Sequence, residues 1–217
     1  MTSSLAAESL DHARFAVVDV ETTGGRALDG GRILEVAVAI LEGGTIHLGF
    51  EALLDPGAAI PPWVARLTGI TDGMVAGRPR FGDVAASLGR ALDAAVFVAH
   101  NARFDWAFVS TEIERATGLL LQGPRVCTVR LARKLLPDLP RRNLDTVSYH
   151  FGIEIEGRHR ATGDAVAAAK CLGKMLKLAQ GNGAVCLADL VGLADRRLGG
   201  STAASPTAEP PNRPTAS

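Results

Sequence analysis

The stretch that most constrains the fold is residues 15–24, FAVVDVETTG, because an apolar run there carries two acids. Its apolar and β-branched side chains predict a buried β-strand. Asp19 and Glu21 are two positions apart, so both side chains leave the same face of that strand. Burial of a carboxylate is costly unless the group is paired or bound to a metal ion. Either the strand ends there and both acids point into water, or they hold a hard divalent cation such as Mg²⁺ or Mn²⁺.

Charges are balanced over the whole chain but unevenly distributed along it. The 217 residues are 47% hydrophobic with 23 basic and 23 acidic side chains, which suits one globular domain without a uniformly basic surface. Residues 1–60 contain three basic and nine acidic side chains, whereas residues 123–160 contain eight and four. This separation predicts an acidic site beside a basic rim, as a nucleic acid would require, and ordinary scatter of surface charge is the alternative.

Cysteine spacing and hydropathy indicate a soluble protein. Cys127, Cys171 and Cys186 form no C-x-x-C motif, so we expect reduced thiols packed as small hydrophobes. Residues 1–12 lack a basic segment and an apolar core, and no uncharged apolar run is long enough to span a membrane. We therefore expect a cytoplasmic protein with no signal peptide and no membrane partner.

The spacing of apolar and turn-forming residues predicts an α/β fold. Strands are expected at residues 15–22, 33–41, 45–54, 95–99 and 125–129, the first three as an antiparallel meander. Helices are expected from residue 61 onward and at residues 81–92, 101–117, 131–136, 143–152, 161–179 and 187–198. Asn101 should cap its helix, whose apolar stripe would comprise Phe104, Ala107, Phe108 and Thr111.

Three acidic segments fall at the ends of predicted elements, namely residues 19–21 (DVE), 100–105 (HNARFD) and 159–164 (HRATGD). Asp105 and Asp164 each lie in the first turn of a predicted helix, where the helix dipole alone favours a carboxylate. A sheet could bring all four acids to one pocket, and such a cluster is hard to sustain without two divalent ions. A two-metal site of this kind hydrolyses phosphodiesters.

These segments resemble, in order, the three motifs of the DEDDh 3′–5′ exonucleases, a family that includes the epsilon subunit of bacterial DNA polymerase III, ribonuclease T and oligoribonuclease. The resemblance covers roughly residues 12–180 and implies a ribonuclease H-like fold with a mixed five-stranded sheet flanked by helices. It also implies that His159 is the base that deprotonates the attacking water. The carboxylates that would hold two Mg²⁺ or Mn²⁺ ions are Asp19, Glu21, Asp105 and Asp164.

The resemblance further implies which residues meet the terminal nucleotide of the substrate. These substrate-binding residues are Thr22, Thr23, Gly24, His100, Asn101 and Phe104. The expected partners are single-stranded or frayed 3′ ends of DNA, with RNA open because nothing in the sequence reads the sugar 2′-hydroxyl. A polymerase or a repair protein is a further expected partner.

The leading hypothesis is a metal-dependent exonuclease that releases 5′-mononucleotides from the 3′ end of DNA, of proofreading or repair type. An exoribonuclease or oligoribonuclease is the first alternative. A catalytically silent module that binds nucleic acid or a polymerase is the second, but its signature would be a lost ligand, and all four acids and His159 are present. Two departures are Thr68-Gly69-Ile70-Thr71, where many relatives have His-Gly-Ile-Thr, and the lack of a clamp-binding peptide in residues 180–217.

The domain organisation expected from this comparison has four parts. Residues 1–11 would be a flexible N-terminus, residues 12–180 the exonuclease domain and residues 181–198 a short helical extension. Residues 199–217 consist largely of Gly, Ser, Thr, Ala and Pro, and they are expected to form a disordered tail because they can bury little apolar surface.

Overall fold

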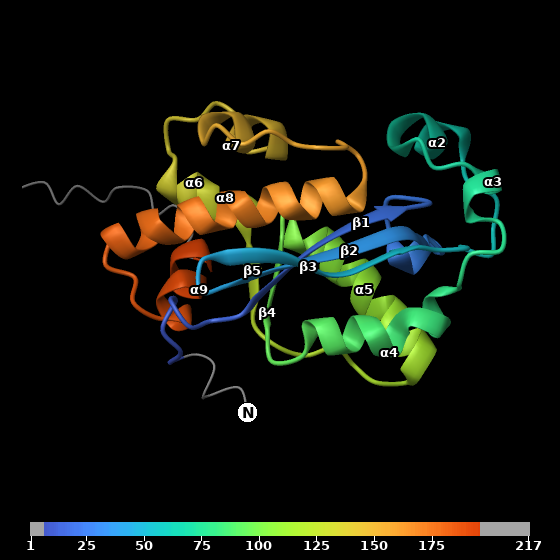
Figure 1. The fold of residues 1–217 in the computed structure, drawn as a ribbon, viewed down its shortest axis with the longest axis horizontal. Coiled ribbons are helices and arrows are strands. Elements are labelled where there is room, and N and C mark those ends of the chain that lie inside the picture. Colours follow the sequence, from blue (N-terminus) through green and yellow to red (C-terminus); the bar gives the residue numbers. More distant parts are fainter. Residues whose placement is uncertain (1–6, 196–217) are drawn as a thin grey trace, which may run out of the picture.

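A computed structural model describes residues 7–195, which form a five-stranded sheet with helices on both faces (Figure 1). The strands are β1 (Phe15–Thr22), β2 (Ile33–Glu42), β3 (Thr45–Leu53), β4 (Val96–Ala99) and β5 (Arg125–Cys127). Their order across the sheet is β3-β2-β1-β4-β5. The first three form an antiparallel meander, whereas β4 and β5 run parallel to β1. The predicted mixed five-stranded sheet is therefore confirmed.

Helices cover the two faces of this sheet in separate layers (Figure 1). One layer contains α4 (Phe81–Leu92) and α5 (Ala102–Thr117), and the other contains α6 (Thr128–Leu135), α7 (Leu144–His150) and α8 (Ala161–Gly181). The remaining helices are η1 (Ala27–Asp29), α2 (Pro62–Thr68), α3 (Asp72–Val75) and α9 (Leu187–Asp195). Within residues 7–195, no helix combines the length and the apolar character needed to cross a bilayer.

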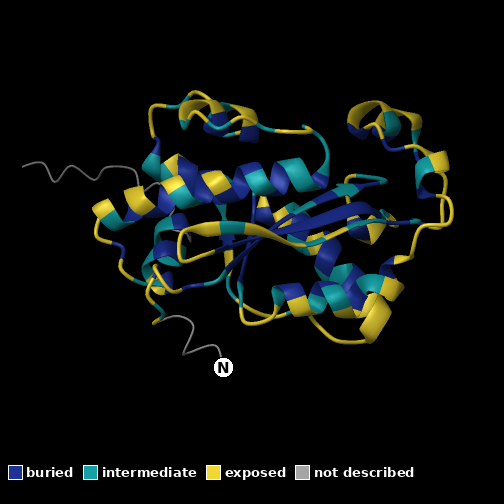
Figure 2. Cartoon of the chain, in the orientation of Figure 1, coloured by how far each residue is buried: buried dark blue, intermediate teal, exposed yellow. Residues whose placement is uncertain are grey.

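The central strand β1 packs its two faces into two different cores. Phe15 and Val17 belong to the core beneath α8. The residues of β1 that face α4 and α5 are Ala16, Val18 and Val20. Because strand side chains alternate, Asp19 and Glu21 continue the series of Phe15 and Val17 and lie on the face that α8 covers. Figure 2 shows the strands at the centre of the sheet as buried, so the two acids end a strand that is otherwise inside the protein.

Parallel pairing fixes the edge of the sheet at which the motif segments meet. β1, β4 and β5 point the same way, so the segments that follow them leave the sheet at the same edge. These segments begin at residues 23, 100 and 128. Strand direction thus brings together the first two motifs, at residues 19–21 and 100–105, whereas the third, at residues 159–164, reaches this edge at the start of α8.

Two local predictions about this region are wrong. The strand predicted at residues 125–129 ends at Cys127, because its neighbour β4 ends at Ala99, the pairing partner of Cys127, and offers no backbone beyond it. The chain continues as α6 from Thr128. The predicted helix start at residue 131 is therefore three residues too late.

The apolar stripe predicted for α5 is also misplaced. Phe108 is buried as expected, but Ala107 is exposed. The helix instead buries a face that includes Asp105 and Glu112. Glu112 is paired with Arg32, whose Nε lies 2.5 Å from its Oε1, so a polar contact settles the orientation that apolar spacing predicted incorrectly.

The first described residues pack against the last described helix. Leu10 is buried, and the Leu187 backbone N–H donates to the Glu8 carbonyl at 3.0 Å. Residues 8–11 therefore differ from the flexible N-terminus predicted for residues 1–11. The predicted tail at residues 199–217, and the end of the helix predicted at residues 187–198, lie outside the described residues.

Candidate active site

The structure brings the predicted carboxylates together at the edge where β1 ends. Asp19 and Glu21 on β1 and Asp164 in the first turn of α8 each offer an oxygen, and these three oxygens lie within 4.8 Å of one another. Asp105, in the first turn of α5, is buried. Among the charges that raise the pKa of Asp19, that of Asp105 has the largest effect.

Burial raises the pKa of all four acids, and repulsion by neighbouring acids of the cluster adds to this effect at Asp19 and Glu21. Burial and then the charge of Asp164 raise the pKa of Glu21 to about 8, and burial raises the pKa of Asp105 to about 8. The pKa of Asp19 lies well above its ordinary range because this side chain is buried and faces the other three. Burial also raises the pKa of Asp164, against the opposing effect of Arg158. The positive charge that surrounds the four carboxylates is thus too small to keep their pKa values in the ordinary range.

The donor atoms of this cluster fit divalent cations. Asp164 Oδ1 is buried and has no hydrogen-bond partner among the described residues, whereas its Oδ2 accepts a hydrogen bond from Arg158. A buried carboxylate oxygen without a partner is costly, and a cation would satisfy it. A set of carboxylate oxygens alone is the donor type that hard ions prefer. Asp19, Glu21 and Asp164, with Asp105 beside them, are therefore the residues that would hold metal.

Glu35 ties the start of α8 to the sheet. It is paired with Glu21 across β1 and β2 and is buried. Its carboxylate accepts hydrogen bonds from the Ala161 backbone N–H at 2.9 Å and from Arg160 Nε at 2.9 Å. This arrangement satisfies one of the free N–H groups at the helix start and fixes the turn that carries Asp164. Sequence analysis missed Glu35, although an acid within the apolar run 33–41 is the same signal that marked Asp19.

The loop before α8 places Arg158 next to the carboxylates. Arg158 is held by Asp145, with Nε donating to Oδ1 at 2.7 Å, while Nη1 donates to Asp164. His159 has φ of +63°, a left-handed conformation that is strained for a residue other than glycine. Its Nδ1 lies 3.3 Å from Arg158 Nη1. Nothing in the sequence pattern distinguished Arg158 from its neighbours.

A glycine allows this loop to lie close against α8. A Cβ atom on Gly163 would lie 1.8 Å from the carbonyl oxygen of Glu156 and 2.9 Å from that of Gly157. Only a residue without a side chain fits there. The close contact between Gly163 and residues 156–157 therefore determines where Arg158 and His159 lie.

Two of the predicted substrate-binding residues shape the turn after β1. The Thr22 hydroxyl donates to the Gly24 carbonyl at 2.8 Å, and the Thr23 hydroxyl accepts from the Arg32 backbone N–H at 2.9 Å. The hydroxyls are thus engaged within the protein, and the contribution of residues 22–24 to substrate binding stays a prediction.

His100 is held by the protein through both ring nitrogens. Nδ1 lies 2.9 Å from the Thr128 hydroxyl and Nε2 lies 2.9 Å from the Arg142 carbonyl oxygen. Burial lowers the pKa of His100 to about 4, so the ring is neutral at pH 7, with Nε2 donating to the carbonyl. In this arrangement His100 supports a neighbouring loop and has no ring nitrogen free for a substrate.

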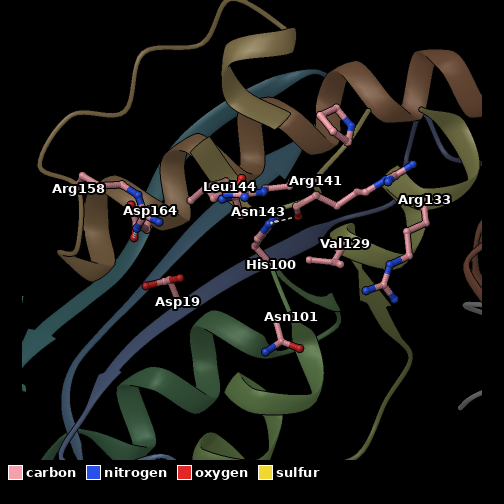
Figure 3. A pocket seen from close by; sticks show the side chains of 12 residues that line it. Asp19, His100, Asn101, Val129, Arg133, Arg141, Asn143, Leu144, Arg158 and Asp164 are labelled. Carbon is pink, nitrogen blue, oxygen red and sulfur yellow. Dashed lines mark hydrogen bonds and ion pairs between the residues drawn. The ribbon is translucent and has the colours of Figure 1, made fainter. Parts of the chain in front are cut away.

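Two pockets open beside the carboxylates and share Asn101. The first, of about 640 Å³, contains Asp19, Asp164, His100 and Arg158, and Figure 3 shows these side chains together with Arg133 and Arg141. The second, of about 360 Å³, contains Phe104 with Leu28, which is 84% exposed. Of the predicted substrate-binding residues, His100 and Asn101 line the first pocket, and Asn101 and Phe104 line the second.

Comparisons with known proteins identify relatives of this constellation. The RNase T family model, described as an exonuclease, matches residues 16–172. The chain is 32% identical over 170 residues to the DNA polymerase III subunit epsilon of Aquifex aeolicus, covering 78% of the chain and 84% of that protein. It is 38% identical over 165 residues to the PolC-type DNA polymerase III of Clostridium perfringens, covering 76% of the chain and only 11% of that much longer protein.

Solved structures share the fold. Exonuclease X in complex with 5′ overhanging duplex DNA superposes with a TM-score of 0.66 at 24% identity, covering 84% of this chain and 99% of that one. The ribonuclease H-like arrangement expected from the motifs is thus confirmed.

The raised carboxylate pKa values predict how stability depends on pH when metal is removed. In EDTA the folded protein holds protons on Glu21 and Asp105 up to about pH 8, whereas the unfolded chain releases them near their ordinary pKa values of about 4. The folded state therefore binds more protons, and the free energy of unfolding should rise as pH falls from 8 towards 5. Thermal unfolding in EDTA at both pH values measures this.

Asp19→Asn isolates the contribution of the carboxylates to the pH dependence of stability. The lowered pKa of His100 makes the free energy of unfolding fall as pH falls, and this effect is present in both wild type and variant. Without metal the variant should be more stable than the wild type at pH 8, by on the order of 1–3 kcal/mol, because one repelling charge is gone. Mn²⁺ should then raise the melting temperature of the wild type far more than that of the variant. A variant less stable in EDTA would show that Asp19 is not under repulsion.

Gly163→Ala should displace the loop that carries Arg158 and His159. We expect a loss of about 1–3 kcal/mol from the forced backbone shift, together with weaker Mn²⁺ binding by calorimetry. Gly173→Ala on the same helix is the matched control, because its Cβ would meet only Leu41 Cδ2 at 3.9 Å. That variant should be neutral or more stable by up to ~1 kcal/mol. Equal behaviour of the two variants would contradict the close approach at Gly163.

Proposed function

Because the chain belongs to the RNase T family of exonucleases, whose DEDDh motifs it carries, we propose that it hydrolyses phosphodiester bonds of DNA from the 3′ end and releases 5′-mononucleotides. The observation that carries the proposal is the group of oxygens from Asp19, Glu21 and Asp164 within 4.8 Å of one another. Carboxylates at this spacing would bind divalent cations, and two such ions activate a water and stabilise the leaving oxygen in phosphodiester hydrolysis. The proposed activity concerns the 165 residues that this chain shares with the PolC-type polymerase, which are 11% of the length of that protein.

The carboxylates would hold two Mg²⁺ or Mn²⁺ ions. Such ions, when bound, lower the pKa of water and stabilise the attacking and leaving oxygens of an in-line displacement. The protein supplies fixed positions: Glu35 holds the turn that carries Asp164, and buried Asp105 lies beside Asp19. Preorganised charge of this kind needs no rearrangement during the reaction.

His159 would accept the proton from the attacking water. Its Nε2 has no hydrogen-bond partner among the described residues, while Nδ1 contacts Arg158. A ring nitrogen without a partner can accept a proton, which suits this role. Arg158, gripped by Asp145, would hold its guanidinium beside the phosphate and balance the negative charge of Asp164.

The terminal nucleotide would lie between the turn after β1 and the start of α5. Thr22, Thr23 and Gly24 would face its sugar and phosphate, and Phe104 would pack against its sugar or base in the 360 Å³ pocket. Asn101 would bridge this pocket and the carboxylates. Apolar packing without base-specific partners predicts little sequence preference.

DNA is the substrate that the relatives favour. The A. aeolicus relative is by name a subunit of DNA polymerase III, and the Exonuclease X structure contains duplex DNA with a 5′ overhang. We therefore propose single-stranded or frayed 3′ ends of DNA as substrate and proofreading or repair, with a polymerase or repair protein as partner, as the setting. RNA is the second candidate, because no residue singled out here reads the 2′-hydroxyl.

The direction and metal requirement of cleavage test this proposal. We expect stepwise release of 5′-mononucleotides from 5′-labelled strands with Mg²⁺ or Mn²⁺, and no release in EDTA. Matched DNA and RNA strands run side by side give the substrate preference. Cleavage of a closed circular strand, or full activity in EDTA, would rule the proposal out.

A pair of variants separates the base from the metal ligands. Asp19→Asn should lose Mn²⁺ affinity and turnover together. His159→Ala should keep Mn²⁺ binding in calorimetry while turnover falls by roughly 10²–10⁴-fold, the usual share of general-base catalysis. If His159→Ala loses metal as severely as Asp19→Asn, the histidine is a ligand or a support.

A further inference from the structure

The 640 Å³ pocket is acidic at one end and basic at the other. Figure 3 shows Asp19, Asp164 and Arg158 on one side, with Arg133 and Arg141 on the far side beyond His100. Of the arginines that line this pocket, Arg158 is engaged by Asp145 and Asp164. Arg133 and Arg141, by contrast, have neither an ion pair nor a hydrogen bond within residues 7–195, and both are exposed. Two uncompensated positive charges therefore face the same open space as the carboxylates.

The loop that presents Arg141 is built to hold its shape. The Arg142 guanidinium does not serve the pocket as a free charge, because its Nη2 donates to the carbonyl oxygens of Leu136 at 3.1 Å and Pro137 at 2.8 Å. The Arg142 carbonyl in turn accepts from His100 Nε2 at 2.9 Å. Asn143 then caps α7 by accepting from the Thr146 backbone N–H at 3.0 Å. Residues 137–143 are thus fixed from both ends, which leaves Arg141 projecting from a rigid support.

Apart from Asn101 and Asn143, the remaining surface of the pocket is apolar. Val129, Pro140 and Leu144 are its apolar lining residues. A strand whose 3′ end lies at the carboxylates must extend away from them, since its upstream phosphates are repelled by acids and attracted by arginines. A basic groove lined by apolar side chains is the form of site that tracks the backbone of a single strand irrespective of sequence.

We propose that Arg133 and Arg141 bind the phosphates of the nucleotides upstream of the scissile bond, so that the single strand enters over the loop at residues 137–143. The inference rests on the proposed function for the identity of the strand's 3′ end. His100 acts here as a positioning residue: it holds the Arg142 carbonyl and thereby the loop that presents Arg141. This use accounts for a neutral, doubly hydrogen-bonded histidine inside a motif that sequence analysis assigned to direct substrate contact.

Binding of a 5′-fluorescein-labelled dodecathymidylate in EDTA, followed by anisotropy, tests the two arginines without turnover. Arg133→Ala and Arg141→Ala should each weaken binding by about tenfold, as expected for loss of a charged hydrogen bond. The slope of log affinity against log salt should become shallower by about 0.7 for each arginine removed. Arg90→Ala is the matched control, since Arg90 is an exposed arginine on α4, in the layer on the other face of the sheet, and donates a hydrogen bond to Ser87.

A minimal substrate separates failure of this inference from failure of the proposed function. The p-nitrophenyl ester of thymidine 5′-monophosphate has no upstream phosphate, so the Arg133→Ala/Arg141→Ala double variant should hydrolyse it with Mn²⁺ at the wild-type rate. His100→Gln should lower dodecathymidylate affinity while leaving hydrolysis of the ester within a few-fold of the wild type. Unchanged affinity and salt slope in the double variant would overturn the upstream site. No ester hydrolysis by the wild type would instead overturn the proposed function.

Discussion

Repulsion among buried carboxylates is the constraint on which the rest of this structure depends. Asp19, Glu21 and Asp164 meet where β1 ends. Burial raises the pKa of each, and the charges of neighbouring acids raise the pKa of Asp19 and Glu21 further. A protein that forms such a cluster must hold it together by other contacts, because the acids themselves push apart. The surrounding residues supply them. Glu35 binds the start of α8, Arg158 neutralises Asp164, and Gly163 admits the loop that carries Arg158.

The same constraint explains why much of the site could be predicted from sequence. An acid inside an apolar strand is conspicuous, so residues 15–24 mark Asp19 and Glu21 as candidate metal ligands, and the motifs at residues 100–105 and 159–164 then favour the metal site. The alternation of strand side chains also predicts that both acids leave the same face, and in the structure that face is the one that α8 covers. Helix bounds also followed closely where apolar spacing was regular, as in α4, which spans Phe81–Leu92 as expected.

What could not be predicted depends on contacts between distant segments. The orientation of α5 is settled by Glu112 and Arg32, which are 80 positions apart, and the end of β5 by the length of β4. Arg158, in the loop before α8, is held in position by a hydrogen bond to Asp145 on α7. His100 lies in a motif that implied substrate contact, yet its hydrogen bonds go to Thr128 and Arg142. No local sequence pattern predicts which arginines will form ion pairs within the protein and which will remain available to a ligand.

The pairing of the two described chain ends has a consequence for where a partner would lie. The strand segment at Ser9 bridges to Cys186, and Gln180 donates to Asp11, so both ends meet beside the start of β1. The carboxylates lie at the other end of that strand, about 20 Å away for an eight-residue strand. A partner that contacted residues 8–11 or 180–187 would therefore lie remote from the carboxylates.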